Sequence, residues 1–481
     1  MVASEATPWA KSGGLADVLG ALPGALTRLG HEVATVIPRY MGARTAPANR
    51  VLRDVRIALG NRNYDVTVWQ LEASGPPMYF VDEPGLFDRP GIYGIAGRDF
   101  PDNHVRFAVL SKTALEISRR LFRADVIHCH DWQASLVPAF LKDPRIADPH
   151  WLGLRTLLTI HNLGYQGLFD RPLLEEMGLP PEFYTVDGVE FWGQINLLKA
   201  GIVFADAIGT VSVKYAEEIQ TPEYGFGLDG LLRKRRGLLT GILNGADYNR
   251  WNPQTDPFIP AHYSADDLSG KLNCKQDLLR ELGLPERAMQ RPLFGIVSRF
   301  TAQKGFDLIA EAAPQVFKDD VYLAALGDGE ARWQELFRKL QADFPEKIAL
   351  HLGYDDRLAH RIEAGADIFL MPSRYEPCGL NQIYSLRYGT VPVVRATGGL
   401  DDTIANAPPN EATGFKFLDY NGKALVDAIR QASRKWADRK AWNAMMVRGM
   451  LKDFSWTASA CEYSRLYGKI ASSGAAGDSN F

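Results

Sequence analysis

The sequence predicts an α/β protein built from two doubly wound domains. Short apolar runs rich in β-branched residues end in Gly, Ser, His or Pro, and stretches of helical character follow them. Continuous apolar strands that alternate with helices are typical of parallel sheets covered on both faces. Because such a series occurs twice along the 481 residues, we expect two domains of this kind.

The first series occupies the first half of the chain. Its predicted helices are residues 104–122 and 132–141. Its predicted strands are residues 33–37, 66–71, 78–81, 126–130, 156–161 and 207–212. An earlier strand at residues 1–4 is shorter than the roughly five or six residues usual for a central strand, so we expect the natural chain to begin a few residues earlier.

The second series begins after about residue 290. Its predicted strands are residues 293–298, 321–326, 348–352, 368–371 and 391–394, and its predicted helices are residues 304–317, 330–344 and 380–388. The stretch 246–264 between the two series is rich in Pro, Asn and Asp, which predicts a linker. Two similar segments, Ser12-Gly-Gly-Leu-Ala-Asp-Val and Thr397-Gly-Gly-Leu-Asp-Asp-Thr, are either repeated turns that open a helix or a chance match.

Composition narrows the class of protein. Lys and Arg total 54 against 57 Asp and Glu, and this balance argues against nucleic acid or an anionic membrane as the main partner. The four cysteines lie far apart without a C-x-x-C pair, which argues against a disulfide framework or a structural zinc site and favours a reducing compartment. No apolar run approaches the roughly 20 residues of a membrane span, and the N-terminus lacks the features of a signal peptide. We therefore expect a soluble, cytoplasmic protein.

Lys11, Gly13 and Gly14 lie between the first strand and a helix. Glycines let the backbone approach a ligand closely, and the free N–H groups at a helix start bind anions. A lysine beside the positive end of a helix is unfavourable unless an anion lies between them. The segment is thus either an anion site or a plain glycine turn with a solvated lysine.

Polar residues also follow two predicted strands of the first series. The segments are His128-Cys-His-Asp-Trp and Thr159-Ile-His-Asn. Ligands of open parallel sheets bind at the carboxyl ends of the strands, so these residues are well placed for binding. Strand alternation turns His128 and His130 to one face, but no carboxylate spacing supports a metal site. Capping of the strand ends is the alternative interpretation.

In the second series, Arg299 and Lys304 flank a loop between a strand and a helix. Two cations converging at the end of a parallel strand suit a diphosphate, and the alternative is a pair of solvated surface cations. The chain contains no Walker A sequence, so nothing supports hydrolysis of a nucleotide by a P-loop.

The segment Pro372-Ser-Arg-Tyr-Glu-Pro-Cys-Gly-Leu-Asn-Gln follows the predicted strand 368–371. We expect it to open a helix with Pro377 at the first helical position. Glu376 would then lie near the helix N-terminus, where the helix dipole keeps a carboxylate ionised. The alternative is that Glu376 only caps this helix.

Together these segments resemble the bacterial glycogen synthase and plant starch synthase family of retaining glucosyltransferases. The resemblance covers nearly the whole chain in the family's order. It is carried by Lys11-Ser-Gly-Gly-Leu-Ala-Asp-Val, His130-Asp-Trp-Gln, Thr159-Ile-His-Asn, Leu243-Asn-Gly-Ala-Asp, Ser298-Arg-Phe-Thr-Ala-Gln-Lys-Gly, Pro372-Ser-Arg-Tyr-Glu-Pro-Cys-Gly-Leu, Arg387-Tyr-Gly-Thr-Val-Pro-Val-Val and Thr397-Gly-Gly-Leu.

The resemblance implies a GT-B fold, in which two Rossmann-like domains face each other across a deep cleft. It places an acceptor-side domain at residues 1–245, completed by a C-terminal helix at 457–471, and a nucleotide-sugar domain at 265–456. The linker at 246–264 lies between them, and the small polar residues 472–481 are expected to be a frayed tail.

The implied reaction transfers glucose from ADP-glucose to the non-reducing end of an α-1,4-glucan such as glycogen, with retention of configuration. No D-x-D occurs in the sequence, which is consistent with a mechanism without a metal or other cofactor. One alternative is a UDP-glucose-dependent or other GT-B glycosyltransferase. Another is a non-catalytic glucan-binding protein. Glycogen phosphorylase is excluded, because no motif for a pyridoxal-bearing lysine is present.

The resemblance also implies roles for individual residues. Positive groups stabilise the departing diphosphate, and Glu376 bonds sugar hydroxyls and offsets the positive charge on the sugar. Tyr384 stands eight positions after Glu376, where related retaining transferases have a second Glu, which disfavours schemes with two carboxylates. The catalytic residues implied are Lys11, Asp131, His161, Arg299, Lys304 and Glu376.

Further residues are implied to bind the substrates. Lys11 contacts the donor from the opposite domain, so that the cleft must close during the reaction. Tyr354 stacks on the adenine, and Asp17 reaches the ribose. The substrate-binding residues implied are Lys11, Gly13, Gly14, Asp17, Asn162, Asn244, Arg299, Lys304, Tyr354, Cys378, Gly379 and Leu380.

Overall fold

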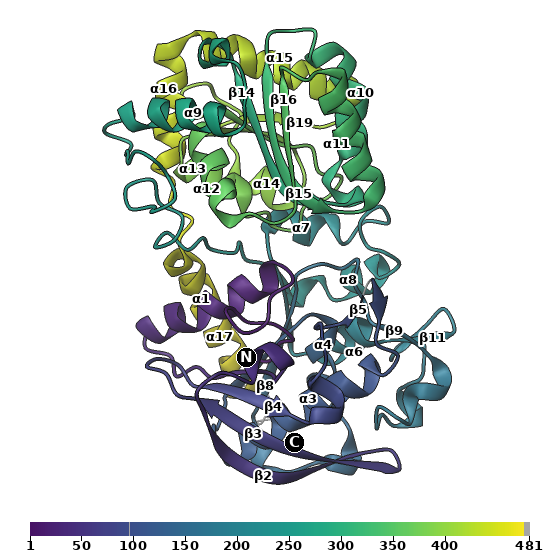
Figure 1. Ribbon diagram of the computed structural model, residues 1–481. Helices are drawn as coiled ribbons and strands as arrows, with labels where there is room; N and C mark the ends of the chain where they lie inside the picture. The colour runs from purple at the N-terminus through teal and green to yellow at the C-terminus, as the bar shows by residue number, and fades with distance from the viewer. Residues whose placement is uncertain (96, 476–481) are drawn as a thin grey trace. The chain divides into compact units, whose positions relative to one another are not determined.

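The computed structural model describes residues 1–95 and 97–475, and its contacts divide the chain into two compact units (Figure 1). Unit 1 comprises Met1–Val211, Ala216–Gly245 and the chain from Trp456 onward, and unit 2 comprises Ser212–Tyr215 and Ala246–Ser455. Of the tail expected at residues 472–481, the part from residue 476 lies outside the described residues. Residues 472–475 continue the last helix, α17 (Trp456–Ala475).

Unit 1 is built around one sheet whose two halves meet at Val2. The halves have the strand orders β1-β4-β3-β2 and β13-β12-β8-β7. Val2 forms parallel bridges with Val36 and Cys129, so the expected first strand is a short bridging segment between β1 and β7. The strands are β1 (Thr35–Pro38), β2 (Ala48–Leu59), β3 (Arg62–Leu71), β4 (Met78–Asp82), β7 (Val126–His130), β8 (Arg155–Ile160), β12 (Ala207–Thr210) and β13 (Leu239–Gly241).

One part of this sheet differs from the expected parallel arrangement. Strands β2, β3 and β4 pair antiparallel, and β2 and β3 are joined by a two-residue turn between Leu59 and Arg62. So short a turn allows only antiparallel neighbours, because a parallel crossover needs about a dozen residues or more. Buried and exposed residues alternate from Val55 to Leu59, at the end of β2 next to the turn. The strand therefore lacks a continuous apolar run, the feature from which the other strands were predicted.

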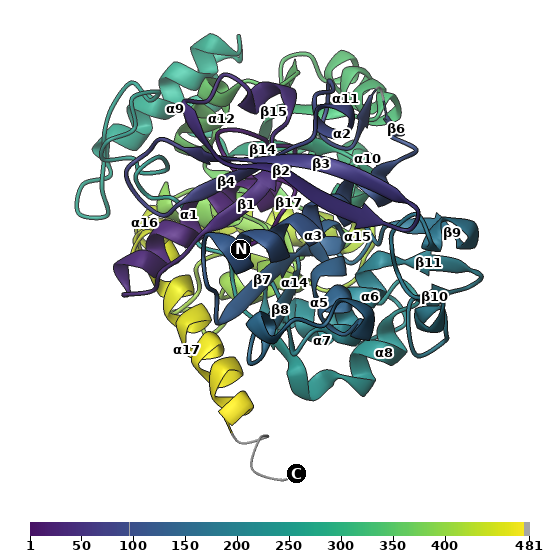
Figure 2. The same ribbon diagram turned by 90° about the horizontal axis from the view of Figure 1, so that it is seen from below.

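Helix α17 packs within unit 1, alongside α1 (Gly14–Arg28), as Figure 2 shows. Its residues Ala460, Tyr463 and Leu466 share a buried apolar cluster with Val18 and Leu22 of α1. The expected helix at 457–471 thus lies inside α17, and its apolar side covers the sheet of unit 1.

The remaining elements of unit 1 are short apart from one helix, α3. The helices are α2 (Pro84–Phe87), α3 (Asn103–Arg120), α4 (Asp131–Ala134), α5 (Leu136–Leu141), α6 (Leu197–Phe204), α7 (Val213–Glu218, whose first residues belong to unit 2) and α8 (Asp229–Lys234). The strands are β5 (Gly94–Ile95), β6 (Arg98–Asp99), β9 (Leu168–Asp170), β10 (Glu190–Phe191) and β11 (Gln194–Asn196).

Unit 2 contains a parallel sheet of six strands in the order β16-β15-β14-β17-β18-β19. Numbered along the chain, this is the 3-2-1-4-5-6 order of a Rossmann fold. The strands predicted for the second series are confirmed, and a sixth is added. They are β14 (Leu293–Phe300), β15 (Tyr322–Gly329), β16 (Ile348–Leu352), β17 (Ile368–Met371), β18 (Val391–Arg395) and β19 (Phe415–Phe417).

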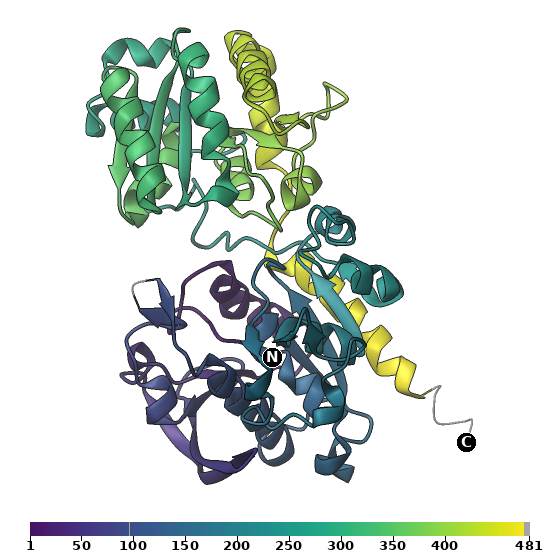
Figure 3. The same ribbon diagram turned by 90° about the vertical axis from the view of Figure 1, so that its right-hand side faces the viewer.

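Helices cover both faces of the unit 2 sheet (Figure 3). Phe294 and Ile296 of β14 pack with α10, α11, α15 and α16, whereas the neighbouring Leu293 packs on the other side with α9, α12, α13 and α14. Both faces are therefore buried, as expected for a doubly wound sheet. The helices are α9 (Ser269–Glu281), α10 (Phe306–Val316), α11 (Ala331–Asp343), α12 (Asp356–Gly365), α13 (Asn381–Arg387), α14 (Gly398–Thr403), α15 (Gly422–Ala437) and α16 (Arg439–Met450).

The stretch 246–264, expected as a linker, belongs to unit 2. Trp251 is stacked between the rings of His360 and Tyr384, with centroid distances of 3.7 Å and 4.2 Å. The buried carboxylate of Asp256 lies 2.8 Å from His360 Nδ1 and accepts a hydrogen bond from Tyr388. Among the described residues of both units, no helix is both long and apolar enough to cross a membrane.

Candidate active site

Two of the expected residues of unit 2, Lys304 and Glu376, meet where the winding of its sheet reverses, between β14 and β17. Lys304 lies in the loop after β14, and Glu376 lies in the loop after β17. Lys304 Nζ donates to Glu376 Oε2 at 2.6 Å, and Ser373 Oγ donates to the same oxygen at 3.0 Å. The side chains of Lys304 and Glu376 are only 17% and 8% exposed, so water screens their attraction weakly. Ligands of doubly wound sheets bind at this position.

The expectation that Glu376 and Pro377 open a helix is wrong. Helix α13 begins only at Asn381. The carbonyl oxygens of Glu376 and Pro377 instead accept hydrogen bonds from Gly399 N, at 3.1 Å and 3.2 Å. The charge of Glu376 is therefore held by the Lys304 ammonium group and not by a helix dipole.

The second Gly-Gly segment shapes the loop that carries Glu376. Gly398 has φ +46°, and a Cβ there would collide with the carbonyl oxygen of Glu376. A Cβ on Gly399 would collide with the backbone of Cys378 in the same way. Glycines at both positions let the start of α14 touch the Glu376 loop. By contrast, a Cβ on Gly13 or Gly14 would meet nothing within 4 Å.

The Lys304 loop is also fastened to the Glu376 loop. Gly305 has φ +72°, and a Cβ there would collide with the carbonyl oxygen of Pro372. Arg374 N donates to Gln303 O at 2.8 Å, and Gln303 Nε2 donates to Tyr375 O at 3.1 Å. Backbone contacts thus place the two loops, and the ion pair between their side chains follows from this placement.

The other expected residues of unit 2 lie near the ends of β14, β16 and β17. Arg299 is exposed near the end of β14. Tyr354 follows β16, its side chain is 82% exposed, and its hydroxyl donates to Asp356 Oδ1 at 3.0 Å. Cys378 is buried, Gly379 has φ +71°, and Leu380 precedes α13. The exposed ring of Tyr354 is open to stacking by a planar group.

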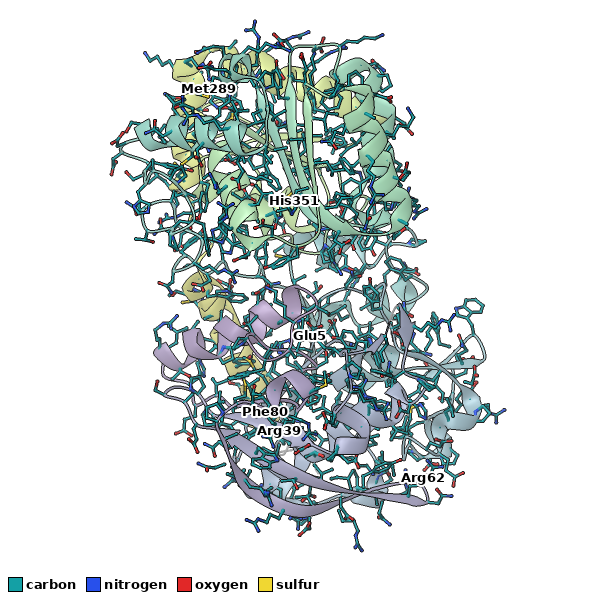
Figure 4. All side chains as sticks on the ribbon, viewed as in Figure 1. Glu5, Arg39, Arg62, Phe80, Met289 and His351 are labelled. Carbon is teal, nitrogen blue, oxygen red and sulfur yellow. The ribbon has the colours of Figure 1, made fainter. Side chains whose placement is uncertain are left out.

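In unit 1, a buried carboxylate that the motif analysis missed holds the Gly-Gly loop. Glu5 is labelled in Figure 4. Its Oε2 accepts hydrogen bonds from Ser12 N at 2.5 Å and Gly13 N at 3.2 Å, and its Oε1 accepts from Ser12 Oγ and Tyr93. Glu5 directly follows the residues around Val2 that bridge the sheet. The same strand-end rule that singled out the histidines would have found it.

Lys11 and Asp17 form an ion pair, with Lys11 Nζ 2.6 Å from Asp17 Oδ1. Lys11 is exposed and Asp17 is partly exposed, so solvent screens this attraction. Asp17 lies in the first turn of α1, where a negative charge is favoured by the helix dipole. The carboxylate of Asp17 in α1 therefore compensates the positive charge of Lys11, which lies just before that helix.

Asp131 and His161 come together at the ends of β7 and β8. Asp131 Oδ1 accepts a hydrogen bond from His161 N at 2.7 Å, and Asp131 has φ +55°, which is rare for a residue other than glycine. Burial raises the pKa of Asp131 to about 7, against the effect of the backbone N–H groups of His161 and Asn162. Burial also lowers the pKa of His161 to about 3, so its ring is neutral at neutral pH.

Two asparagines complete the same edge of the sheet. Asn162 follows His161, and its Oδ1 accepts a hydrogen bond from Gly164 N at 3.0 Å. Asn244 follows β13 and is buried, and its Oδ1 has no hydrogen-bond partner among the described residues. A buried acceptor without a partner is costly, and a ligand hydroxyl would satisfy it.

The metal interpretation of the histidines finds no support. His128 uses both ring nitrogens, at 2.7 Å from Tyr467 OH and 2.7 Å from Thr159 Oγ1. Within residues 1–95 and 97–475, no group of three or more His, Cys, Asp or Glu side chains is arranged to hold a metal ion.

Comparison with known proteins identifies the family. The family model "Starch synthase catalytic domain" matches residues 1–234, and "Glycosyl transferases group 1" matches residues 285–445. The chain is 48% identical to a glycogen synthase of Koribacter versatilis, with 97% of each chain covered. It is 49% identical to a glycogen synthase of Anaeromyxobacter dehalogenans, with 98% of each covered. The chain belongs to the glycogen synthase and starch synthase family of glycosyltransferases.

Solved structures agree with this membership. The catalytic domain of starch synthase IV from Arabidopsis thaliana, bound to ADP and acarbose, superposes with a TM-score of 0.88 at 33% identity, over 98% of each chain. Sucrose-phosphate synthase from Thermosynechococcus elongatus has a TM-score of 0.57 at 17% identity, over 98% of this chain and 96% of that one, and shares the fold alone. The expected GT-B class with two Rossmann-like domains is confirmed for this family member.

Proposed function

We propose that this family member is a glycogen synthase that transfers glucose from ADP-glucose to the non-reducing end of an α-1,4-glucan, with retention of configuration. The observation that carries the proposal is the Lys304–Glu376 pair at the point where the unit 2 sheet reverses its winding. Similarity over the whole chain to glycogen synthases supports the reaction. The ADP and acarbose in the Arabidopsis relative support an adenine nucleotide as donor and a glucan as acceptor.

The residues of unit 2 suit the departure of a diphosphate. As the bond between glucose C1 and the phosphate oxygen breaks, negative charge grows on the diphosphate and positive charge on the sugar. Arg299 and Lys304 stabilise the first charge, and the carboxylate of Glu376 bonds the sugar and offsets the second. Tyr354 stacks on the adenine. Cys378, Gly379 and Leu380 line the glucose site.

Retention follows from attack on the face that the phosphate leaves. The acceptor O4 forms the new bond to C1, and its proton passes to the departing phosphate oxygen. Glu376 is already bonded to Lys304 and Ser373, and Tyr384, in the place of a second acid, is stacked on Trp251. This environment favours a scheme without a covalent glucosyl-enzyme intermediate.

The residues of unit 1 are assigned to the sugar and the phosphates. Lys11 offers positive charge to the donor phosphates, Gly13 and Gly14 let the backbone come close to them, and Asp17 reaches the ribose. Asp131, His161 and Asn162 bond the glucose hydroxyls. Asn244 does the same with its Oδ1, which bonds none of the residues that the structure describes.

We also propose that the reaction needs no metal or cofactor, and that the protein works in the cytoplasm. The positive charges of Arg299, Lys304 and Lys11 take the place that a divalent ion has in other transferases. Among the described residues, Cys129, Cys274 and Cys461 form no disulfide bond, as is usual in a reducing compartment.

A comparison of donors tests the proposal. Glycogen is incubated with labelled ADP-glucose or UDP-glucose, with and without EDTA, and the anomeric configuration of the added glucose is determined by NMR. We expect faster incorporation from ADP-glucose, no effect of EDTA, and α-linked product. Preference for UDP-glucose would favour the alternative transferase. Glucan binding without turnover of either donor would favour a non-catalytic glucan-binding protein.

A further inference from the structure

His128, His130 and His161 lie together at the edge of the unit 1 sheet. In the contact between His130 and His161, the position of the proton decides which ring donates the hydrogen bond. His130 Nδ1 lies 2.9 Å from His161 Nε2, which is a hydrogen-bond distance. Burial lowers the pKa of both rings, so both are neutral at neutral pH. A neutral imidazole carries one proton on one of its two nitrogens. One of the two facing nitrogens must therefore donate and the other accept.

The surroundings of His130 distinguish the two possibilities. His130 is fully buried, and its Nε2 has no hydrogen-bond partner among the described residues. A proton on Nε2 would create a buried N–H group without an acceptor, which native proteins rarely contain. A proton on Nδ1 is used in the contact with His161 and leaves only a lone pair at Nε2. The second arrangement leaves no unused donor in the interior.

Neighbouring groups hold the His130 ring in this orientation. The ring of His128 lies over it, with a centroid distance of 4.0 Å and an interplanar angle of 33°. His128 is itself fixed by hydrogen bonds to Tyr467 of α17 and Thr159 of β8. The two rings are tilted against each other, and both nitrogens of His128 already have hydrogen-bond partners, so His128 does not serve as an acceptor for His130 Nε2.

We propose that His130 is a positioning residue that sets the tautomer of His161, with His130 Nδ1–H donating to His161 Nε2. His161 then carries its own proton on Nδ1. It presents a hydrogen-bond donor, and not a base, to the oxygen of a bound ligand. The meaning of this donor for catalysis rests on the proposed function, in which that oxygen belongs to the transferred glucose.

The tautomer is measured directly by NMR on the full chain without substrate. Selective 15N labelling of the nine histidines, with His161→Gln for assignment, gives the nitrogen shifts of His161. We expect a protonated Nδ1 and an unprotonated Nε2 on His161, together with a protonated Nδ1 on His130. A protonated Nε2 on His161 overturns the proposal. Because no substrate is present, this result is independent of whether the protein is a glycogen synthase.

A pair of variants tests the role of the contact. His130→Phe keeps a flat ring and removes the donor, whereas His128→Phe removes the adjacent ring, whose nitrogens bond Tyr467 and Thr159. We expect His130→Phe to shift the His161 signals towards a mixture of tautomers and to raise KM for the donor about tenfold, with kcat within about threefold. We expect His128→Phe to lower the melting temperature but to leave the His161 tautomer unchanged.

The two variants also separate positioning from packing. If His130→Phe leaves the His161 tautomer and KM unchanged, or if His128→Phe shifts the tautomer equally, the positioning role is overturned. Absence of glucosyl transfer in the parent protein, with the expected tautomer present, would overturn the proposed function and leave the tautomer assignment standing.

Discussion

Lys304 Nζ lies 2.6 Å from Glu376 Oε2, and the two residues come from loops that follow different strands of unit 2. Neither side chain is well solvated, so each charge depends on the other. In the proposed reaction, the same two groups face the departing diphosphate and the sugar. The pair therefore links the stability of the two loops to the chemistry they perform.

We predict that Lys304→Ala and Glu376→Ala each lower kcat by about 100-fold or more, since each removes a charge that acts in a poorly solvated site. The double variant is expected to lose less than the product of the two single losses, because each single variant also leaves its partner unpaired. Incorporation of labelled glucose into glycogen measures all three rates.

Lys339 and Asp343 provide the control for this experiment. They form an ion pair with the same 2.6 Å distance on the exposed side of α11. Lys339→Ala is expected to leave kcat and KM unchanged, because solvent screens exposed pairs and this one lies outside the two loops. Activity of Lys304→Ala or Glu376→Ala comparable to that of Lys339→Ala would refute the assigned roles.

Gly398→Ala is expected to destabilise unit 2 by about 2 kcal/mol or more and to lower activity. The new Cβ would collide with the carbonyl oxygen of Glu376, and φ +46° strains any residue with a side chain. Gly468→Ala in α17 is the matched control, since its Cβ would meet nothing within 4 Å and alanine favours a helix by about 0.5–1 kcal/mol. Urea unfolding measures both, and equal midpoints for the two variants would contradict the prediction.

Glu5→Gln is expected to raise KM for the donor at least about tenfold, because an amide has one oxygen where the Gly-Gly loop uses two. Burial and the charge of Glu5 raise the pKa of Tyr93 well above its usual range, so Tyr93 stays a donor to the carboxylate. Steady-state kinetics measure the change. Glu72→Gln, at an exposed acid of the same unit, is the control. An unchanged KM in Glu5→Gln would show that the loop holds its shape without the carboxylate.

The stability of unit 1 is expected to fall as the pH drops below about 6.5. Burial lowers the pKa values of His128 and His130 well below their usual range, so the unfolded chain takes up protons that the folded unit does not. For each such histidine, the free energy of unfolding falls by about 1.4 kcal/mol per pH unit below the pKa that the residue has in the unfolded chain. Asp131 has the opposite effect between pH 7 and about 4, because burial raises its pKa to about 7 and the folded unit then binds a proton that the unfolded chain does not. The stabilisation from this one group is smaller than the destabilisation from the histidines.

Urea midpoints measured from pH 7.5 to pH 5.5 check this dependence. The double variant His128→Phe/His130→Phe is expected to show a shallower slope than the parent, whatever its absolute stability. A parent midpoint that does not change over this range would mean that the histidines are protonated in the folded unit.

Much of the fold could be predicted from local patterns. The strands of unit 2 read as continuous apolar runs because both faces of their sheet are buried, and all of those predicted are present. Strand β2 was missed because its alternating end near Val55 resembles an ordinary polar segment. Much of the candidate site could be predicted from glycines and charged residues at the ends of the predicted strands, because ligands of parallel sheets bind at the carboxyl ends of the strands.

The sequence by itself determined the α/β class, the parallel sheet of unit 2 and the family, because each of these depends on residue types at short spacing. Only the tertiary structure decided that Lys304 holds Glu376, that Gly398 allows the Glu376 loop to pack, and that Glu5 holds the Gly-Gly loop. The Lys304 and Glu376 positions are 72 residues apart, as are many pairs that make no contact. Such contacts depend on how closely two buried backbone segments approach each other in space. Short-range sequence patterns carry no information about that approach.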